Sequence, residues 1–264
     1  PNGPLSLGHS RGVMINGEYA ATYDGKLILR FDDTDTKNKP PDKRAYDWIQ
    51  EEFRWLTGYK PDAIIYASGR MDLYLERATE FVAEGHLYVC SCPAPHFKKL
   101  RETQQDCPCR DIPVDDQEAR WQRMLDPKGG WREGHAVVRA RTGMGHKNPA
   151  LRDWPALRIQ TTPHPLVGSK YRVWPLLDFQ SAIEDHEQEV THIIRGKDLM
   201  DSTRKQQLLY DMLGWDYPET LYWGRVKVHE FGGFSTSQMS ADIEAGTVGG
   251  WGDPSLPTIQ ALRR

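Results

Sequence analysis

A short apolar run that ends in carboxylates lies near the beginning of the chain: K-L-I-L-R-F-D-D-T-D, residues 26–35. Its length and composition are those of a buried strand followed by a turn. Helices and strands are expected to alternate around it, with helices at 8–23, from Pro40-Pro41-Asp42 onward and at 70–84, and strands at 62–66 and 87–89. This alternation predicts a parallel sheet with helices on its faces.

The pattern changes between residues 88 and 176, where cysteines, prolines and short β-type runs replace the regular alternation. We interpret this stretch as an inserted α+β domain. The first pattern then resumes, with strands expected at 190–194 and 222–228 and a helix at 198–213. The sequence therefore predicts an α/β fold in which 1–87 and 177–264 are the two halves of one domain, divided by the insertion at 88–176.

Composition limits the classes of protein to which the chain can belong. Of 264 residues, 34 are Lys or Arg and 37 are Asp or Glu, so the formal net charge is −3. Hydrophobic residues make up 38% and the mean hydropathy is −0.67, so a water-soluble protein is expected and no membrane association. The near-neutral charge excludes a uniformly basic nucleic-acid coat but allows a local basic face. The first residues contain no secretory leader and no Met, so we expect a cytoplasmic location and a trimmed end.

All four cysteines fall within twenty residues, as two C-x-C pairs separated by fourteen residues: Cys90, Cys92, Cys107 and Cys109. Two such pairs can supply the four thiolates of a tetrahedral zinc site, and the Pro after Cys92 and after Cys107 suits a tight turn. Since four protein ligands leave no open position, such a site would be structural. Two alternatives stay open: reduced thiols without a ligand, and disulfides, which the expected cytoplasmic location disfavours.

Two segments near the start have the composition of ligand-binding loops. Residues 1–12 place glycines before the first predicted helix, where free N–H groups favour phosphate, with His9 and Arg11 as further donors. The alternative is a loop that only caps the helix. Three carboxylates follow the first strand, at Asp32, Asp33 and Asp35. They can hold an ammonium group, a ribose or a metal, or can belong to an Asx-type turn.

Two further segments contain residues suited to binding phosphate. A glycine- and hydroxyl-rich loop at 232–240 precedes a predicted helix, and it can donate hydrogen bonds to phosphate or can be a helix cap. Lys98, Lys99 and Arg101 lie on a predicted helix between the two Cys pairs. They can touch nucleic-acid phosphate or can form a solvated basic face.

In their order along the chain, these segments resemble the class I aminoacyl-tRNA synthetases, and within them the glutamyl and glutaminyl enzymes. The first nine residues, P-N-G-P-L-S-L-G-H, are similar to the signature named for His-Ile-Gly-His, and R-F-D-D-T-D at 30–35 is similar to a run of the glutamyl and glutaminyl enzymes. F-S-T-S at 234–237 stands where these enzymes carry the Lys-Met-Ser-Lys-Ser loop. Further blocks resemble archaeal glutamyl-tRNA synthetases: N-P-A-L-R-D-W at 148–154, H-I-I-R-G at 192–196 and G-W-G-D-P at 250–254.

The resemblance implies a Rossmann-type catalytic domain, split by an insertion that binds the acceptor arm of tRNA and holds a zinc ion on the cysteine segment. It implies an enzyme that joins L-glutamate to ATP in the presence of Mg²⁺, forming glutamyl-adenylate and pyrophosphate. Glutamate would then pass to the terminal adenosine hydroxyl of tRNA(Glu). No enzyme nucleophile is expected, because positioning and charge stabilisation account for such catalysis. A monomer is the habit of the family.

The same resemblance implies site residues by position. Gly8 and His9, with Arg11, would contact the ATP phosphates, and Asp32 would hold the amino group of the substrate. Arg195 would pair with the side-chain carboxylate of glutamate, since its planar fork gives a bidentate match. Other implied positions are Ser6 in the first signature, Leu177 and Ser181 in the amino-acid pocket, and Ser235, Thr236 and Ser237 in a loop that closes over the phosphates.

The sequence departs from the family pattern at several positions. Ser6 replaces the first His of the signature, and Leu177 stands where many relatives have Tyr. The late loop has Thr236 and Gln238 in place of Lys. The usual Arg of the pocket would lie upstream of Pro1, and no anticodon-binding β-barrel is expected in the chain. Three alternatives are therefore kept: a glutamine-specific enzyme, a non-catalytic tRNA-binding paralogue, and an adenylate-forming enzyme that passes glutamate to a modified base or a carrier.

Overall fold

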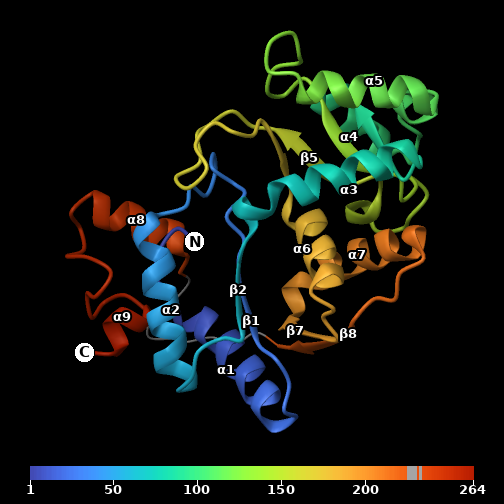
Figure 1. Cartoon of the computed structure of the whole chain (residues 1–264). Helices are drawn as coiled ribbons and strands as arrows, with labels where there is room; N and C mark the ends of the chain where they lie inside the picture. The colour runs from blue at the N-terminus through green and yellow to red at the C-terminus, as the bar shows by residue number, and fades with distance from the viewer. Residues whose placement is uncertain (225–230, 232–233) are drawn as a thin grey trace.

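The computed structural model describes residues 1–224, 231 and 234–264, and Figure 1 shows the arrangement of its elements. Its helices are α1 (Leu7–Thr22), α2 (Lys43–Thr57), α3 (Met71–Ala83), α4 (Ala94–Glu102), α5 (Val114–Leu125), α6 (Leu177–Glu187), α7 (Met200–Leu213), α8 (Thr236–Glu244) and α9 (Ile259–Leu262). Its strands are β1 (Ile28–Phe31), β2 (Ala63–Tyr66), β3 (Leu87–Cys90), β4 (Val137–Ala140), β5 (Pro155–Ile159), β6 (Val173–Pro175), β7 (His192–Gly196) and β8 (Glu219–Trp223).

None of the described helices combines the length and apolar character needed to cross a bilayer. Parts of the expected strand at 222–228 and of the expected loop at 232–240 lie outside the described residues.

Local sequence signals determine where several helices begin and end. Asp42 caps α2 by accepting a hydrogen bond from the N–H of Arg44, and Gly58 ends the helix in the left-handed conformation, with φ of 79°. Gly214 ends α7 in the same way, with φ of 67°. The helices expected at 8–23, from Pro40-Pro41-Asp42 onward, at 70–84 and at 198–213 are confirmed as α1, α2, α3 and α7.

Two pairs of parallel strands form the predicted α/β part of the fold. β1 pairs with β2, and β7 pairs with β8, both in parallel register. The expectation of one continuous parallel sheet is met in part, because the described strands form two separate two-stranded parallel sheets. Side-chain hydrogen bonds link each pair to a helix. Asn16 of α1 donates to the carbonyl oxygen of Ile194 in β7 at 3.1 Å, and Arg30 of β1 donates to Asp185 of α6 at 2.8 Å.

β3 does not belong to the parallel sheets. It pairs antiparallel with β4 and begins a four-stranded antiparallel sheet of order β3-β4-β5-β6. The prediction that residues 87–89 continue the parallel pattern is therefore wrong. The whole of β3 is an apolar run buried on both faces, a pattern typical of parallel strands, although β3 is an edge strand of this antiparallel sheet. Its pairing is decided by a distant partner, because Leu87 lies opposite Ala140.

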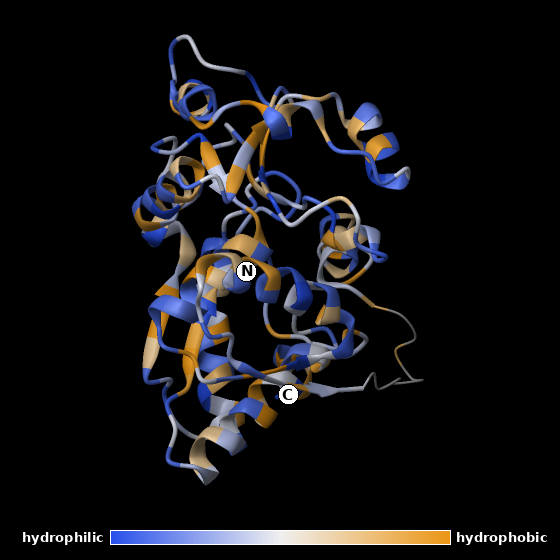
Figure 2. Cartoon of the chain, turned by 90° about the vertical axis from the view of Figure 1, so that its right-hand side faces the viewer, coloured by the Kyte–Doolittle hydropathy of each residue, from blue (hydrophilic) through white to orange (hydrophobic). Residues whose placement is uncertain are grey.

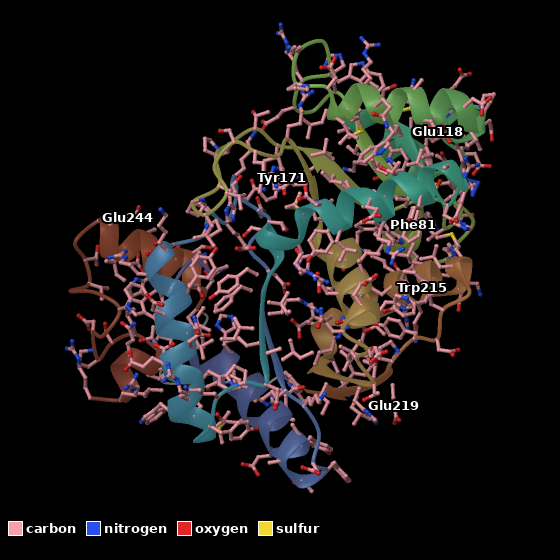
Figure 3. The ribbon with its side chains drawn as sticks, viewed as in Figure 1. Phe81, Glu118, Tyr171, Trp215, Glu219 and Glu244 are labelled. Carbon is pink, nitrogen blue, oxygen red and sulfur yellow. The ribbon has the colours of Figure 1, made fainter. Side chains whose placement is uncertain are left out.

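The main hydrophobic core lies between this antiparallel sheet and helices α3, α5, α6 and α7. Its largest side chains are Trp121, Trp154 and Trp174, each at most 2% exposed. Figure 2 shows hydrophobic residues along the strands, while the outer helix faces and loops are largely hydrophilic. Phe81 on α3 and Trp215 after α7 lie against each other (Figure 3), with ring centroids 5.9 Å apart. The antiparallel sheet and the helices after residue 176 therefore share one core.

The buried carboxylate of Asp33 fixes the loop that follows β1. It is 1% exposed and accepts hydrogen bonds from the Ser68 N–H at 2.7 Å, the Ser68 hydroxyl at 2.8 Å and the Tyr46 hydroxyl at 2.6 Å. The backbone carbonyl of Asp33 lies 2.9 Å from Nε2 of His164, which is also buried. Asp33 therefore joins the loop to α2, to the segment after β2 and to the loop before β6.

Replacing Asp33 by Ala is expected to lower the free energy of unfolding by about 3 kcal/mol, because buried donors on Ser68 and Tyr46 lose their acceptor. Urea unfolding followed by circular dichroism measures this loss. The matched control is Asp47→Ala, since Asp47 is exposed on α2 and its removal should change stability by less than about 0.5 kcal/mol. Equal stabilities of the two variants would contradict the role given to Asp33.

Candidate functional site

The opening loop of the chain packs against residues close to α9. The N–H of Leu7 donates to the carbonyl of Pro257 at 2.9 Å, and the N–H of Ile259 donates to the carbonyl of Leu5 at 2.8 Å. These backbone contacts join two segments at opposite ends of the chain. The opening loop is therefore fixed on the same side of the molecule as α8 and α9.

Glycine at position 3 permits a close contact between the opening loop and α8. A Cβ at Gly3 would lie 2.8 Å from the ring of Trp251 and 2.9 Å from Cγ2 of Thr236, so a side chain there would force one of them to move. Thr236 is the first residue of α8, and the N-terminus lies beside this helix in Figure 1. The structure thus brings the opening loop together with the late hydroxyl-rich segment, as a shared phosphate site requires.

Ser6 and His9 form the N-terminal cap of α1. The Ser6 hydroxyl accepts a hydrogen bond from the His9 N–H at 3.4 Å, and the Ser6 N–H donates to Nδ1 of His9 at 3.2 Å. Ser6 is buried, whereas Gly8 and the His9 ring are exposed. Desolvation by the surrounding protein lowers the pKa of His9 although its ring reaches solvent, so a neutral ring is expected near pH 7. The cap therefore uses the Ser6 hydroxyl and leaves Gly8 accessible.

Arg11 joins α1 to the end of β8. Its Nη1 donates to the carbonyl of Gly224 at 2.6 Å, and its guanidinium lies over the ring of Trp223, 5.7 Å from the centroid. These contacts hold the side chain against β8. Its contact with the ATP phosphates stays a prediction.

The late hydroxyl-rich segment caps α8. The Ser235 hydroxyl accepts a hydrogen bond from the N–H of Gln238 at 3.2 Å, which is the helix-cap arrangement expected as the alternative. Ser235 and Ser237 are exposed, and Thr236 is partly buried beside Gly3. A helix N-terminus that presents exposed hydroxyls can also receive an anion. Capping and phosphate contact are therefore compatible at this segment.

Asp32 is a solvent-exposed carboxylate directly after β1. Its side chain is 36% exposed and accepts hydrogen bonds from Nε of Arg30 at 3.1 Å and from Nε2 of Gln180. Arg30 also pairs with Asp185 at 2.8 Å. Burial opposes the charge of Arg30, but the carboxylates of Asp32 and Asp185 raise its pKa above the ordinary value. Asp32 is therefore held in place while its carboxylate stays accessible.

The other two carboxylates of this run do not join Asp32 in a common site. Asp33 lies in the buried network with Ser68. Asp35 accepts a hydrogen bond from the N–H of Asn38 at 3.0 Å and pairs with Arg158 at 2.7 Å. The Asx-type turn expected as an alternative is thus the structure around Asp35.

The first turn of α6 contacts Asp32 through Gln180. The Gln180 side chain is buried, donates to Asp32 and accepts a hydrogen bond from the Thr34 hydroxyl at 2.9 Å. Leu177 begins α6 and is 49% exposed, whereas Ser181 is buried. Sequence reasoning selected Leu177 and Ser181 and missed Gln180. An amide inside a helical pattern carries no signature that singles it out, so the sequence offered no signal for it.

Arg195 lies near the carboxyl end of β7 and has neutral partners. Its Nη2 lies 3.2 Å from Oε1 of Gln206 and 3.3 Å from the hydroxyl of Tyr217. Within the part of the chain that the structure describes, no carboxylate forms an ion pair with it. The side chain is half-buried. Its positive charge is therefore available to an anionic ligand.

The four cysteines converge as their spacing predicted. Their Sγ atoms lie within 4.8 Å of one another, and that of Cys107 is 3.5 Å from Cys90 and 3.4 Å from Cys92. Four ligands at about 2.3 Å from a zinc ion stand about 3.8 Å apart in a tetrahedron, so small shifts would admit the ion. All four thiols are free in this structure, which favours a metal site over the disulfide alternative.

Neighbouring groups favour the thiolate form of Cys109, whereas burial raises the pKa of Cys92 and the hydrogen bond to Cys109 raises that of Cys107. Hydrogen bonds from the thiols of Cys107 and Cys90 lower the pKa of Cys109. Nη2 of Arg120 lies 3.7 Å from Sγ of Cys109, and the Ser91 hydroxyl lies 3.8 Å from the same atom. Thiolate is the form that binds a metal, and such donors to the sulfur stabilise it. The donor set therefore fits a structural zinc ion.

The helix expected between the two Cys pairs is α4. Lys98 and Lys99 are exposed on it, and Arg101 is partly buried. Lys98 lies 3.9 Å from Glu102 on the same helix. Both interpretations of these cations, phosphate contact and solvated face, stay predictions.

Glu52 is a buried carboxylate beside the opening loop, and sequence reasoning missed it. It is 1% exposed, its Oε2 accepts a hydrogen bond from the Leu5 N–H at 2.6 Å, and its Oε1 has no partner among the described residues. Burial raises the pKa of Glu52 to about 7. The available signal was a Glu between Ile49 and Phe53 on the apolar face of α2. Glu52 therefore ties the opening loop to α2.

Two solved structures share the fold described above. A glutamate tRNA ligase from Elizabethkingia meningosepticum, in complex with its amino acid, matches with a TM-score of 0.63 and 21% identity, over 91% of this chain and 51% of that one. A glutamate-tRNA synthetase from Elizabethkingia anophelis matches with a TM-score of 0.64 and 22% identity, over 91% and 52%. The described parallel strands and helices thus have the same fold as these two solved structures.

Sequence comparison identifies the family to which the chain belongs. The family model of tRNA synthetases class I (E and Q), catalytic domain, matches residues 1–264, so the chain belongs to this family. Similar curated relatives are glutamate–tRNA ligases of Methanothrix thermoacetophila (54% identical), Archaeoglobus fulgidus (53%) and Pyrococcus furiosus (50%). Each match covers 100% of this chain and 46% or 47% of the relative, so the chain spans about half the length of these relatives. The family resemblance inferred from the sequence is confirmed.

The raised pKa of Glu52 predicts a pH-dependent stability. The folded state holds this proton more tightly than the unfolded state, where the carboxyl titrates near 4.5. The contribution to stability is therefore fully present below pH 4.5 and is lost as the pH rises through about 7. Glu52→Gln keeps an acceptor for Leu5 and removes the charge. Its free energy of unfolding relative to wild type should rise by about 3 kcal/mol between pH 5 and pH 8.

Urea unfolding of both proteins at several pH values between 5 and 8 measures this difference. Glu76→Gln, on the exposed face of α3, controls for the loss of one negative charge. Parallel pH profiles of wild type and Glu52→Gln would contradict the prediction.

Proposed function

We propose that this chain is the catalytic part of a glutamate–tRNA ligase, which activates L-glutamate with ATP and transfers it to tRNA(Glu). Curated relatives with this name are 50% to 54% identical over the whole chain. The observation that carries the choice of glutamate is Arg195, whose guanidinium is held by the neutral groups of Gln206 and Tyr217. Such an arginine suits a carboxylate better than the amide of glutamine.

In the first step, an α-carboxylate oxygen of glutamate attacks the α-phosphorus of ATP and pyrophosphate leaves. We assign Asp32 to the substrate ammonium group and Arg195 to the side-chain carboxylate, so that the α-carboxylate is directed at the phosphate. Gly8 and His9 are exposed at the N-terminus of α1. Gly8 would meet the phosphates with its N–H group, His9 with its ring, and the helix with the positive end of its dipole. Mg²⁺ bound to ATP would neutralise part of the phosphate charge.

The segment at the start of α8 would supply further phosphate contacts. Thr236 lies beside Gly3 of the opening loop, and Ser235 and Ser237 are exposed. Because this segment has no Lys, hydroxyl and backbone N–H donors would stabilise the charge that develops on the phosphates. In the second step, a hydroxyl of the terminal adenosine of tRNA attacks the adenylate carbonyl and AMP leaves. Neither step needs an enzyme nucleophile, since positioning provides the acceleration.

We assign residues 88–176 to the acceptor arm of tRNA, between the halves 1–87 and 177–264 of a Rossmann-type domain. The exposed Lys98 and Lys99 support a contact with phosphate. The cysteine cluster would hold one structural zinc ion that orders the segment around it. We further propose that the enzyme is cytoplasmic and monomeric, as expected from the sequence.

Asp32→Ala and Arg195→Ala are each expected to lower glutamate-dependent ATP–pyrophosphate exchange by about 100-fold or more, because each removes a charge-assisted contact with the substrate. Exchange is measured with glutamate and with glutamine, in the presence of total tRNA. Asp47→Ala and Arg204→Ala remove the same charges from exposed helix positions and serve as controls. Exchange supported by glutamine alone would contradict the substrate, and no exchange with any amino acid would support a non-catalytic paralogue.

Cys107→Ser is expected to reduce the zinc content from about one ion per chain to near zero, because a tetrahedral site loses one of its four thiolates. Elemental analysis of the purified protein measures the metal directly. Ser91→Ala changes a neighbour of the cluster that is not a ligand, and it should retain the zinc. We expect Cys107→Ser to impair tRNA charging more than adenylate formation. A wild-type protein without zinc would contradict the assignment.

A further inference from the structure

Arg195 is held by a closed triangle of hydrogen-bonding groups. Oε1 of Gln206 accepts from Nη2 of Arg195 at 3.2 Å and from the Tyr217 hydroxyl at 2.7 Å. The Tyr217 oxygen lies 3.3 Å from the same Nη2. Gln206 is 1% exposed. The guanidinium is therefore fixed by two partners that bear no charge.

A hydrogen bond from the amide nitrogen of Gln206 determines the orientation of this amide. Nε2 of Gln206 donates to the backbone carbonyl of Asp178 at 3.3 Å, so the oxygen of the amide is the atom that faces Arg195. Burial raises the pKa of Tyr217 to about 12, and the nearby charge of Arg195 only partly opposes this. Tyr217 therefore remains a phenol, which donates to Gln206 and accepts from Arg195.

The carboxylates near this triangle are occupied by other cations. The side chain of Asp178 pairs with Lys205 at 2.7 Å, and Asp185 pairs with Arg30 at 2.8 Å. Asp185 is close enough to Tyr217 to contribute to its raised pKa. The described acidic groups around Arg195 thus leave its charge unpaired, although the site contains several of them.

We propose that Gln206 and Tyr217 are positioning residues that hold Arg195 without neutralising it, and that the neutral amide of Gln206 thereby determines the preference for glutamate over glutamine. This inference rests on the proposed role of Arg195 in binding the substrate side-chain carboxylate. A carboxylate at position 206 would take the guanidinium for itself, because an Arg–carboxylate pair is stronger than a hydrogen bond to an amide. It would also repel the carboxylate of glutamate more than it affects the neutral amide of glutamine.

The test is Gln206→Glu, which replaces an amide nitrogen by an oxygen at almost constant shape. Steady-state ATP–pyrophosphate exchange with tRNA present gives KM and kcat for glutamate, glutamine and ATP. We expect KM for glutamate to rise by about 30-fold or more, KM for ATP to stay within about threefold, and the glutamate-to-glutamine preference to fall. The matched control is Gln207→Glu, the same change at an exposed position of α7, which should leave all three values near wild type.

Tyr217→Phe is a second variant, because it removes a neutral partner and adds no charge. It should raise KM for glutamate several-fold but keep the preference for glutamate over glutamine. Gln206→Glu, by contrast, should lower that preference. It also tests the proposal if Gln206→Glu fails to fold, as thermal unfolding will show. A Tyr217→Phe enzyme with an unchanged KM for glutamate would then overturn the role of the triangle.

Two outcomes separate this inference from the function on which it rests. If Arg195→Ala leaves KM for glutamate unchanged, Arg195 does not bind the substrate, and both the proposed pocket and this inference are overturned. If Arg195→Ala abolishes exchange while Gln206→Glu raises KM for glutamate and for glutamine in equal proportion, the pocket stands and the proposed role of Gln206 in specificity is overturned.

Discussion

The buried carboxylate of Asp33 is the constraint on which the geometry of the amino-acid site depends. Three donors from Ser68 and Tyr46 hold it in the interior. The adjacent Asp32 lies in the tight turn after β1, where the N–H of Asp33 donates to the carbonyl of Phe31 at 3.1 Å, and it is exposed. Asp32 then meets Arg30 and stays accessible. A charge inside the protein thus decides which of two adjacent carboxylates can receive a ligand.

Local chemistry allowed part of the fold to be predicted from the sequence. Helix ends were predictable because their signals lie within a few residues, as with the Asp42 cap and the left-handed Gly58 and Gly214. The pairing of β3 was not predictable, because a run buried on both faces fits either sheet and its partner is distant. The division into two parallel pairs likewise depends on contacts between elements far apart in the chain.

In the site, likewise, residues within motifs could be selected from the sequence, and the residues that hold them in place could not. Asp32 and Arg195 could be selected because the runs that contain them, 30–35 and 192–196, resemble the family pattern. Gln180 and Gln206 could not, since an amide acquires its role only from the partner that folding brings to it. Glu52 left a weak signal, a charged residue within an apolar helix face, but its partner Leu5 was not visible from that pattern.

Buried hydrogen bonds connect the loop that bears Asp32 to the end of β5 and to the segment after it. Gln160, just after β5, donates to the carbonyl of Thr34 at 3.3 Å and to the Thr36 hydroxyl at 2.6 Å. His164 meets the carbonyl of Asp33 at 2.9 Å from the segment that follows. Because these contacts are buried, moving the loop would expose or orphan several polar groups at once, which is costly. The position of Asp32 therefore depends on the antiparallel sheet as well as on β1.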